Sequence, residues 1–218
     1  MIDLSTLTTE RRNNETFNLD QMTVAEALIK MNNEDKKVAF AVEEALPNIE
    51  PVISSAIEAF NKGGRLIYMG AGTSGRLGVL DAAECVPTFG VPATQVIGLI
   101  AGGDKAMTVA VEGAEDSLEL GRQDLIDLKL NENDLVLGIA ASGRTPYVIG
   151  ALDYAKEIGA KTASLSCNLN AEISKHAEFP IEVDCGPEFF NRLNKIKIGN
   201  SSKINFEYDF NNFNDWDW

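Results

Sequence analysis

Hydrophobic residues in the middle of the chain form short, nearly unbroken runs, and helical patterns lie between them. Four of the runs predict strands and a fifth is a further candidate: 66–69, 96–100, 135–140, 162–166 and 180–183. Near-continuous apolar runs that alternate with helices are typical of a parallel sheet covered on both faces. The pattern therefore predicts an α/β fold, in which ligands bind beyond the carboxyl ends of the strands.

The segment before the first strand has helical patterns. Its first twenty or so residues are polar and predict an irregular arm. Thr23-Val24-Ala25-Glu26 has the form of a capping box, which marks a helix start. Pro47 and the pair Gly63-Gly64 are stop signals. We therefore expect three helices: from the capping box to about Met31, 34–46 and 49–60.

Two loops rich in glycine, serine and threonine each connect an apolar run to a helical pattern. The first loop is Gly70–Arg76, before the helical pattern of 77–83, and the second loop is Ala141–Pro146, before that of 147–158. A helix that starts after such a turn presents unpaired N–H groups and a partial positive charge, which favour an anion. Serine and threonine hydroxyls add donors for phosphate or sugar oxygens. Two such turns on one sheet predict a phosphorylated polyol as ligand.

Gly70, Gly72 and Gly75 also match the GxGxxG pattern of dinucleotide-binding folds. That pattern is completed by an acidic residue at the end of the following strand. Here the following strand ends at Ile100, and the nearest acid beyond it is Asp104. A nucleotide site and a purely structural tight turn both stay open as alternatives. The second loop, which repeats the same pattern, weakens both of them.

Composition restricts the class of ligand. A formal net charge of −14 over 218 residues, with no basic stripe, argues against nucleic acid. No apolar run approaches the length of a membrane span. The single histidine, His176, is expected on a solvated helix end and argues against a histidine-based metal site or triad. Cys85, Cys167 and Cys185 are few and widely spaced, as in a reduced, cytoplasmic protein.

Two glutamates are candidates for acid–base chemistry by their positions after the loops. Glu84 lies at the end of the helical pattern that follows the first loop. Glu115 follows Gly102-Gly103 and the run Val111–Ala114. Paired carboxylates in a phosphosugar cleft can serve as general acid and base when their surroundings separate their pKa values. Their spacing alone leaves open that both are solvated surface acids.

Four segments of the chain resemble the N-acetylmuramic acid 6-phosphate etherases: 64–78, 83–85, 111–117 and 138–149. The resemblance extends from near the N-terminus to Glu188, with small departures at Ala83 and Val86, where the family usually has serine and proline. It implies a sugar-isomerase (SIS) fold, a three-layer α/β sandwich with a central parallel sheet and an N-terminal helical extension. It also implies a homodimer without metal or cofactor, whose partner is a small phosphosugar.

The resemblance implies cleavage of the D-lactyl ether of N-acetylmuramic acid 6-phosphate to N-acetylglucosamine 6-phosphate and D-lactate, in cytoplasmic recycling of peptidoglycan amino sugars. Lactate would be eliminated across C2–C3 and water would then add. By analogy Glu84 is the proton donor and Glu115 the base. Substrate would be held by the first loop and phosphate by the second, through Gly72, Thr73, Ser74, Ser142, Gly143, Arg144 and Thr145.

The last thirty or so residues depart from the family. Back-translation of this tail with allowed codons and a shift of one base yields a family-like segment, so we hypothesise a frameshift at Phe189-Phe190. A sequencing error and a natural truncation after about Glu188 both stay open as its origin. The expected regions are 1–55 for the arm and helices, 56–188 for the SIS phosphosugar domain and 189–218 for the aberrant tail. Loss of the family segment should expose apolar surface and weaken stability or activity.

Two other functions remain alternatives to a lyase. A non-catalytic SIS regulator that senses a phosphosugar would keep the loops but would not need both carboxylates. A sugar-phosphate isomerase would interconvert aldose and ketose phosphates and release no lactate. The presence of both Glu84 and Glu115 favours the lyase.

Overall fold

The computed structural model describes residue 11 and residues 13–189. The hypothesised frameshifted tail, apart from Phe189, lies outside the described residues, as does most of the expected N-terminal arm. The described chain falls into two compact units: one holds the residues up to Glu44 and from Asp184 onward, and the other is Ala45–Val183. No helix in the described part of the chain combines the length and the apolarity that a membrane span requires.

The smaller unit contains two short 3-10 helices, η3 (Asn14–Thr16) and η4 (Leu19–Gln21), and the beginning of α1 (Val24–Asn61). The predicted capping box is confirmed. The Thr23 N–H donates to a Glu26 carboxylate oxygen at 2.8 Å, and the Glu26 N–H donates to the Thr23 hydroxyl at 3.3 Å. These reciprocal bonds satisfy donors that the first turn of a helix would otherwise leave unpaired.

Helix α1 is a single helix of 38 residues, so the prediction of three separate helices was wrong. Pro47 and Pro51 lie inside it, although each removes one backbone donor. The physical reason is the spacing of the buried apolar positions, which continues across both prolines on one side of the helix. These positions recur every seven residues: Val38, Ala45, Val52 and Ala59.

The larger unit is built on five parallel strands in the spatial order β2-β1-β3-β4-β5. All five predicted strands are confirmed, with ends that differ from the prediction by one residue at most. Their bounds are β1 (Leu66–Gly70), β2 (Val96–Ile100), β3 (Leu135–Ile139), β4 (Lys161–Ser166) and β5 (Phe179–Glu182).

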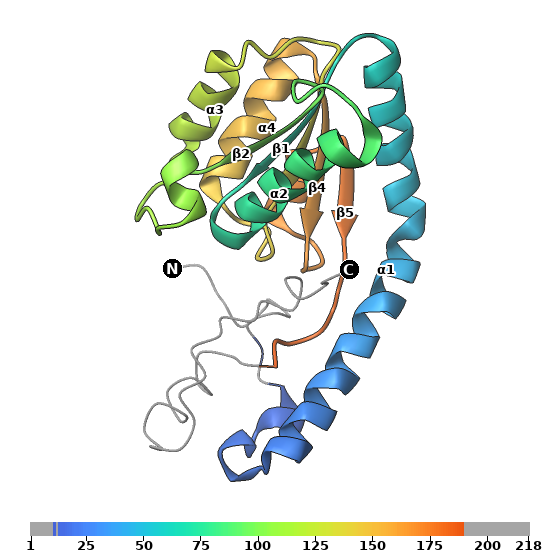
Figure 1. Ribbon diagram of the computed structural model, residues 1–218, viewed down its shortest axis with the longest axis vertical. Helices are drawn as coiled ribbons and strands as arrows, with labels where there is room; N and C mark the ends of the chain where they lie inside the picture. Colours follow the sequence, from blue (N-terminus) through green and yellow to red (C-terminus); the bar gives the residue numbers. More distant parts are fainter. Residues whose placement is uncertain (1–10, 12, 190–218) are drawn as a thin grey trace. The chain divides into compact units, whose positions relative to one another are not determined.

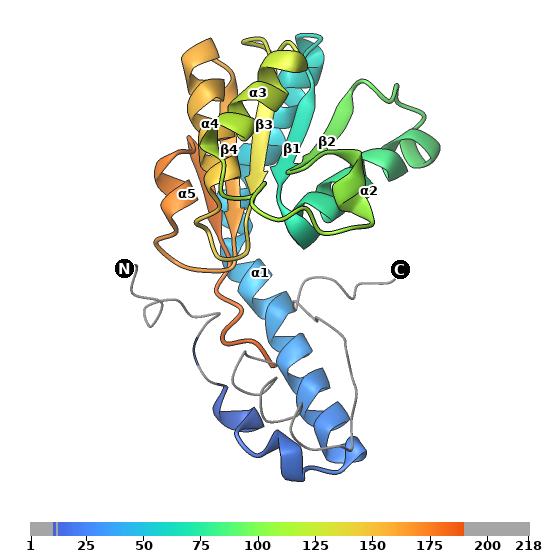
Figure 2. The same ribbon diagram turned by 90° about the vertical axis from the view of Figure 1, so that its left-hand side faces the viewer.

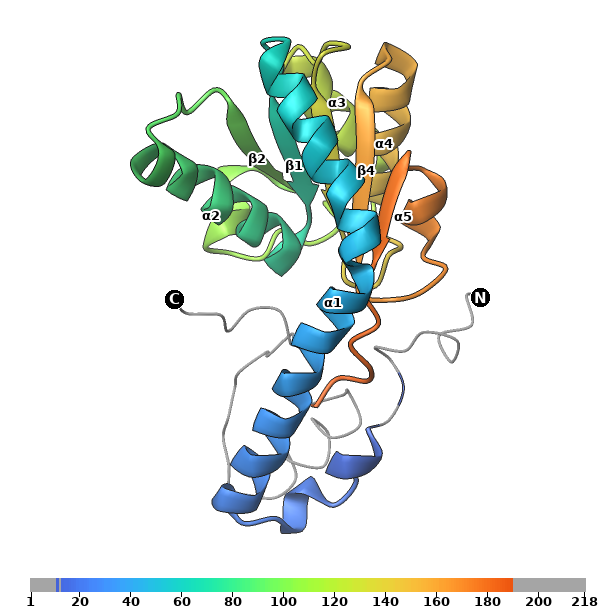
Figure 3. The same cartoon turned by 90° about the vertical axis from the view of Figure 1, so that its right-hand side faces the viewer.

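Helices cover both faces of the sheet, which confirms the expected three-layer sandwich. Their bounds are α2 (Gly72–Phe89), α3 (Leu118–Asp127), α4 (Pro146–Ile158) and α5 (Glu172–Lys175). In the larger unit, α3 and α4 lie on one face, and α2 lies on the other face together with the second half of α1 (Figures 1, 2 and 3). The sequence pattern predicted neither α3 nor the early start of α2.

The two faces of the sheet are buried to different extents. On the α4 side, Ile67, Met69 and Val136 are fully buried in the main core. On the α2 side, Tyr68 faces α2, where a Cβ on Gly78 would lie 2.7 Å from the tyrosine Cβ. Tyr68 and Leu137, both on central strands, are only half-buried. The α2 side therefore retains accessible apolar surface in a fold that normally covers both faces.

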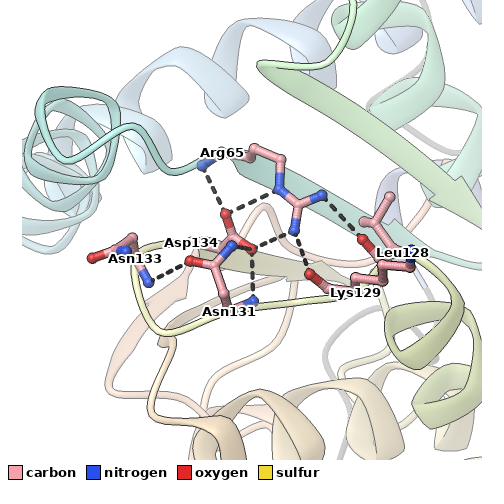
Figure 4. A network of polar contacts seen from close by, with 6 residues as sticks. All are labelled: Arg65, Leu128, Lys129, Asn131, Asn133 and Asp134. Atoms are coloured by element: carbon pink, nitrogen blue, oxygen red, sulfur yellow. Dashed lines mark hydrogen bonds and ion pairs between the residues drawn. The ribbon is translucent and has the colours of Figure 1, made fainter.

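A buried ion pair connects the amino ends of the two central strands (Figure 4). The guanidinium group of Arg65, just before β1, donates to both carboxylate oxygens of Asp134, just before β3, at 3.0 and 2.6 Å. Asp134 is fully buried, and its carboxylate also accepts from the backbone N–H groups of Arg65 and Asn131. Arg65 further donates to the carbonyls of Leu128 and Lys129, so all charged and polar atoms of the pair are well satisfied.

We predict that Asp134→Ala lowers the free energy of unfolding by about 3 kcal/mol, because it leaves the Arg65 guanidinium without its buried partner. Denaturant titration of the purified chain measures the change. Glu58→Ala is the control, since it removes a pair with Lys62 in which both side chains are about half exposed. We expect the control to leave the unfolding midpoint nearly unchanged. Equal losses in the two variants would contradict the role given to the Arg65–Asp134 pair.

Candidate functional site

The first and second loops meet where the direction of the chain connections reverses. From β1 the chain continues through α2 to β2 on one side, and from β3 it continues through α4 to β4 on the other side. Helices α2 and α4 cover opposite faces of the sheet (Figures 2 and 3). The carboxyl ends of β1 and β3 therefore flank the topological switch point, which is where open α/β sheets bind their ligands.

Most of the first loop belongs to the first turn of α2, whereas the sequence pattern placed it before the helix. The helix starts this early because two glycines are in close contact. A Cβ on Gly75 would lie 2.6 Å from the carbonyl oxygen of Gly70. Thr73 and Ser74 lie in this first turn, where backbone N–H groups have no acceptor within the helix. No side chain caps this end.

The second loop is held by backbone hydrogen bonds, one to the residue that precedes it and two from residues that follow β4. The Gly143 N–H donates to the Ala140 carbonyl at 2.8 Å, and the Gly143 carbonyl accepts from the Ile173 N–H at 2.9 Å. The Ala141 carbonyl accepts from the Cys167 N–H at 3.0 Å. Gly143 has a φ of +69° and packs on Ala171, so this position favours glycine on both counts.

The second loop leads directly into α4 and presents donors there. Thr145 is the N-cap but makes no side-chain capping bond, and Pro146 is the first helical residue. Ser142 and Thr145 are half-buried. The Nε of Arg144 is buried and has no hydrogen-bond partner in the part of the chain that the structure describes. A buried donor without a partner is unfavourable, and an anion at this loop would supply the missing acceptor.

The structure brings Glu115 to the second loop. Its backbone carbonyl accepts a hydrogen bond of 3.0 Å from the N–H of Tyr147, the second residue of α4. The side chain of Glu115 is exposed to solvent, and Ser117 caps α3 two residues later. Its carboxylate is therefore carried on a segment that is fixed to the helix that starts at the second loop.

Glu84 lies on α2 and is not brought to the loops of its own chain. It follows Gly72 by twelve residues (84 − 72), so it lies about 18 Å further along the helix axis. That separation exceeds the reach of one sugar phosphate held at the first loop. Glu84 is exposed, and on the same helix Leu80 and Phe89 are also exposed, at 56% and 73%.

Arg76 is a residue whose role the sequence did not indicate. Its Nε donates to the Met107 carbonyl at 3.0 Å and its Nη2 donates to the Ala106 carbonyl at 2.8 Å. Both carbonyls belong to the 3-10 helix η5 (Asp104–Met107), which follows β2. Arg76 thus holds the loop after β2 against the start of α2. Two of its N–H groups are used in hydrogen bonds within the protein.

Tyr147 and Asp124 form a second interaction that sequence reasoning missed. The buried Tyr147 hydroxyl donates to the Asp124 carboxylate at 2.6 Å. Burial raises the pKa of Asp124, while the hydrogen bond from Tyr147 acts to lower it. Burial and the contact with Asp124 raise the pKa of Tyr147. No signal in the sequence distinguished Asp124 among the 33 acidic residues.

His176 lies at the C-cap of α5, as expected for a helix end, and its Nδ1 is 2.6 Å from a carboxylate oxygen of Asp153. The ring is thus paired with an acid and not simply solvated. Across the described residues, no group of three or more histidine, cysteine, aspartate or glutamate side chains is placed to hold a metal ion.

The fold and the paired loops define a protein of the SIS class. Residues 48–156 match the family model described as the glucokinase regulatory protein N-terminal SIS domain. An N-acetylmuramic acid 6-phosphate etherase of Lactococcus lactis (strain IL1403) is 94% identical over 94% of this chain and 69% of its own length. Such an etherase of Enterococcus faecalis is 68% identical over 93% of the chain and 69% of its own length. The chain belongs to the N-acetylmuramic acid 6-phosphate etherase family.

Solved structures support the fold independently. A phosphoheptose isomerase from Francisella tularensis superposes with a TM-score of 0.56 at 20% identity, over 81% of this chain and 92% of the isomerase. A phosphoheptose isomerase from Neisseria gonorrhoeae gives a TM-score of 0.55 at 18% identity, over 81% and 94%. At these identities the likeness concerns the fold alone.

We predict that Gly143→Ala weakens binding of inorganic phosphate about tenfold or more, because the added methyl collides with Ala171 and shifts the second loop. Isothermal titration calorimetry with phosphate measures the effect. Gly90→Ala is the matched control, since Gly90 has a φ of +67° at the end of α2 but open space around it. The control should lose some stability and keep phosphate affinity. Unchanged affinity in Gly143→Ala would contradict the assignment of the second loop.

Proposed function

We propose that this chain is a carbon–oxygen lyase that cleaves the D-lactyl ether of N-acetylmuramic acid 6-phosphate and yields N-acetylglucosamine 6-phosphate and D-lactate. The observation that carries the proposal is the hydrogen bond that holds Glu115 to the start of α4, beside the second loop. It puts a carboxylate-bearing segment next to a loop suited to phosphate. The high identity to relatives named as etherases supports the same activity.

The second loop binds the 6-phosphate. Backbone N–H groups at the start of α4 and the hydroxyls of Ser142 and Thr145 supply donors, and the helix dipole adds partial positive charge. The buried Nε of Arg144 gains an acceptor when phosphate is present. Gly72, Thr73 and Ser74, at the start of α2, hold the sugar from the other side of the switch point.

Glu115 acts as the base. Its carboxylate removes the proton from C2 of the sugar, the C2–C3 double bond forms, and the bond from C3 to the ether oxygen breaks. The departing oxygen needs a proton, which Glu84 supplies, so lactate leaves with the ether oxygen. Water then adds across the double bond, with hydroxyl at C3 and a proton at C2. Both carboxylates act as ordinary general acid–base catalysts, and the sequence of steps is balanced without a redox partner.

The position of Glu84 is accounted for by a homodimer. One chain cannot hold a single substrate at its loops and also reach it with its own Glu84, given about 18 Å along α2. The exposed apolar side chains Leu80 and Phe89 on the same helix suit an interface between two copies. In the proposed dimer, each site takes the loops and Glu115 from one chain and Glu84 from its partner. The phosphorylated substrate and the reduced-thiol composition fit a cytoplasmic enzyme of amino-sugar recycling.

We predict that Glu115→Gln and Glu84→Gln each lower the rate of D-lactate release by 100-fold or more, while binding of the phosphosugar is retained. A coupled D-lactate assay and calorimetric titration measure the two quantities. Glu112→Gln is the matched control, because Glu112 is exposed on the same segment as Glu115 and has no assigned role. Turnover that survives in Glu115→Gln would refute its role as the base.

The rate of D-lactate release by the Lactococcus lactis relative, measured in the same assay, is the reference for the rate of this chain. This chain spans about 69% of that relative's length, and the α2 side of its sheet is only half-buried at Tyr68 and Leu137. Because this side of the sheet keeps accessible apolar surface, we expect this chain to release D-lactate more slowly than the relative.

Complementation between variants tests the shared site. Glu84→Gln and Glu115→Gln are each expected to be nearly inactive alone. Co-expressed in equal amounts, they should recover about a quarter of the wild-type activity, because half of the dimers are mixed and one of the two sites in each is intact. A mixture that stays as inactive as its components would place both carboxylates in the same chain's site.

A phosphosugar-sensing regulator is the second candidate, because the matching family model is named after a domain of a regulatory protein. The D-lactate assay separates the two. A regulator would bind the phosphosugar in wild type and in both glutamine variants alike, and none of the three proteins would release lactate.

A further inference from the structure

Tyr147 connects three parts of the candidate site at one residue. Its N–H donates to the Glu115 carbonyl at 3.0 Å, and its hydroxyl donates to Asp124 of α3 at 2.6 Å. Its carbonyl packs on Gly121 of α3, where a Cβ would collide with it. The side chain is fully buried, directly after the second loop. The proposed reaction uses neither the buried phenol of Tyr147 nor the carboxylate of Asp124, which is half-buried.

Two close backbone contacts fix α3 against α4. Gly121 lies against the carbonyl of Tyr147, and Gly150 lies against the carbonyl of Leu118, so neither position has room for a side chain. The Tyr147–Asp124 bond crosses the same contact and sets how the two helices are aligned. Because Glu115 lies three residues before α3 begins, the alignment of the helices sets where the Glu115 segment meets α4.

The second loop does not depend on this contact. Gly143 is anchored to Ala140 at the end of β3 and to Ile173 of α5, and Ala141 is anchored to Cys167 just after β4, all through backbone hydrogen bonds. For Glu115, by contrast, the hydrogen bond from the Tyr147 N–H to its backbone carbonyl links it to the start of α4. A change at Tyr147 or Asp124 can therefore move Glu115 relative to a phosphate loop that stays in place.

We propose that Tyr147 and Asp124 are positioning residues, which hold the base Glu115 at the correct place beside the phosphate bound to the second loop. This inference rests on the proposed role of Glu115. The hydroxyl–carboxylate bond acts through the backbone of Tyr147, and neither side chain touches substrate. The chemistry needs such a device because a displacement of about 1 Å can cost 100-fold in rate.

Amide hydrogen exchange followed by NMR tests the positioning directly. In Tyr147→Phe, exchange of the residue-147 N–H should be about tenfold faster, as its bond to Glu115 loosens, while the amides of Gly143 and Ile173 keep their wild-type rates. Tyr154→Phe, the same change on the same helix but farther from the loop, should alter none of the three. Unchanged exchange at residue 147, or equal acceleration at all three amides, would overturn the proposal.

Steady-state kinetics give a second readout that a merely structural role would not produce. Tyr147→Phe and Asp124→Leu should lower kcat for D-lactate release about tenfold and leave KM unchanged, because phosphate binding is retained. Asp124→Asn, which keeps an acceptor for the phenol, should restore most of kcat. A lower kcat with a higher KM and a lower Tm would indicate a merely structural role and count against positioning. So would failure of Asp124→Asn to restore the rate.

The two claims fail in different ways. If Glu115→Gln keeps its turnover, the proposed base is wrong, whatever the exchange experiment shows. If Glu115→Gln is inactive but Tyr147→Phe changes neither the amide exchange rate nor kcat, Glu115 remains the base and the proposed role of Tyr147 and Asp124 is wrong. In the Glu115→Gln background, Tyr147→Phe should leave the residual kcat unchanged, since there is no longer a base to position.

Discussion

Arg65 and Asp134 lie side by side immediately before β1 and β3, and the register of the two central strands begins at this ion pair. The next residues, Leu66 and Leu135, are paired in the sheet, and the pairing continues to Gly70 and Ile139. Because the pair is buried and fully hydrogen-bonded, a shift of one residue would leave a charge without its partner. The contact at the amino ends therefore determines which residues meet at the carboxyl ends.

At the carboxyl ends, that register places the first and second loops beside each other. Their helices then diverge to opposite faces, so two helix N-termini meet at the same edge of the sheet from two sides. Gly75 allows α2 to start directly on β1, and Gly143 allows the second loop to fold onto Ala171. The anion binding that we propose for this site would thus rest on the backbone. In our proposal, catalysis comes from side chains on other elements: Glu115, held through α3 and α4, and Glu84, farther along α2.

Much of this could be predicted from the sequence, because buried parallel strands and helix caps leave local patterns. The strands appear as apolar runs, and the bond between Thr23 and Glu26 follows from their spacing alone. Helix α1 was predicted as three pieces because Pro47 is a local stop signal, whereas the continuous buried face that outweighs it is a tertiary effect. The separation of Glu84 from the loops depends on where α2 begins, which only the Gly70–Gly75 contact explains. The Tyr147–Asp124 bond joins residues 23 positions apart and has no local signature.

The central claim is that the loops and carboxylates of this chain break the bond between C3 of the sugar and the ether oxygen, and the fate of the oxygen atoms tests it most directly. The chain is incubated with N-acetylmuramic acid 6-phosphate in water labelled with oxygen-18, and both products are analysed by mass spectrometry. The account predicts the label in the C3 hydroxyl of N-acetylglucosamine 6-phosphate and none in D-lactate beyond exchange of its carboxylate. Label in the lactate hydroxyl would mean attack of water on the lactyl carbon and would contradict the account.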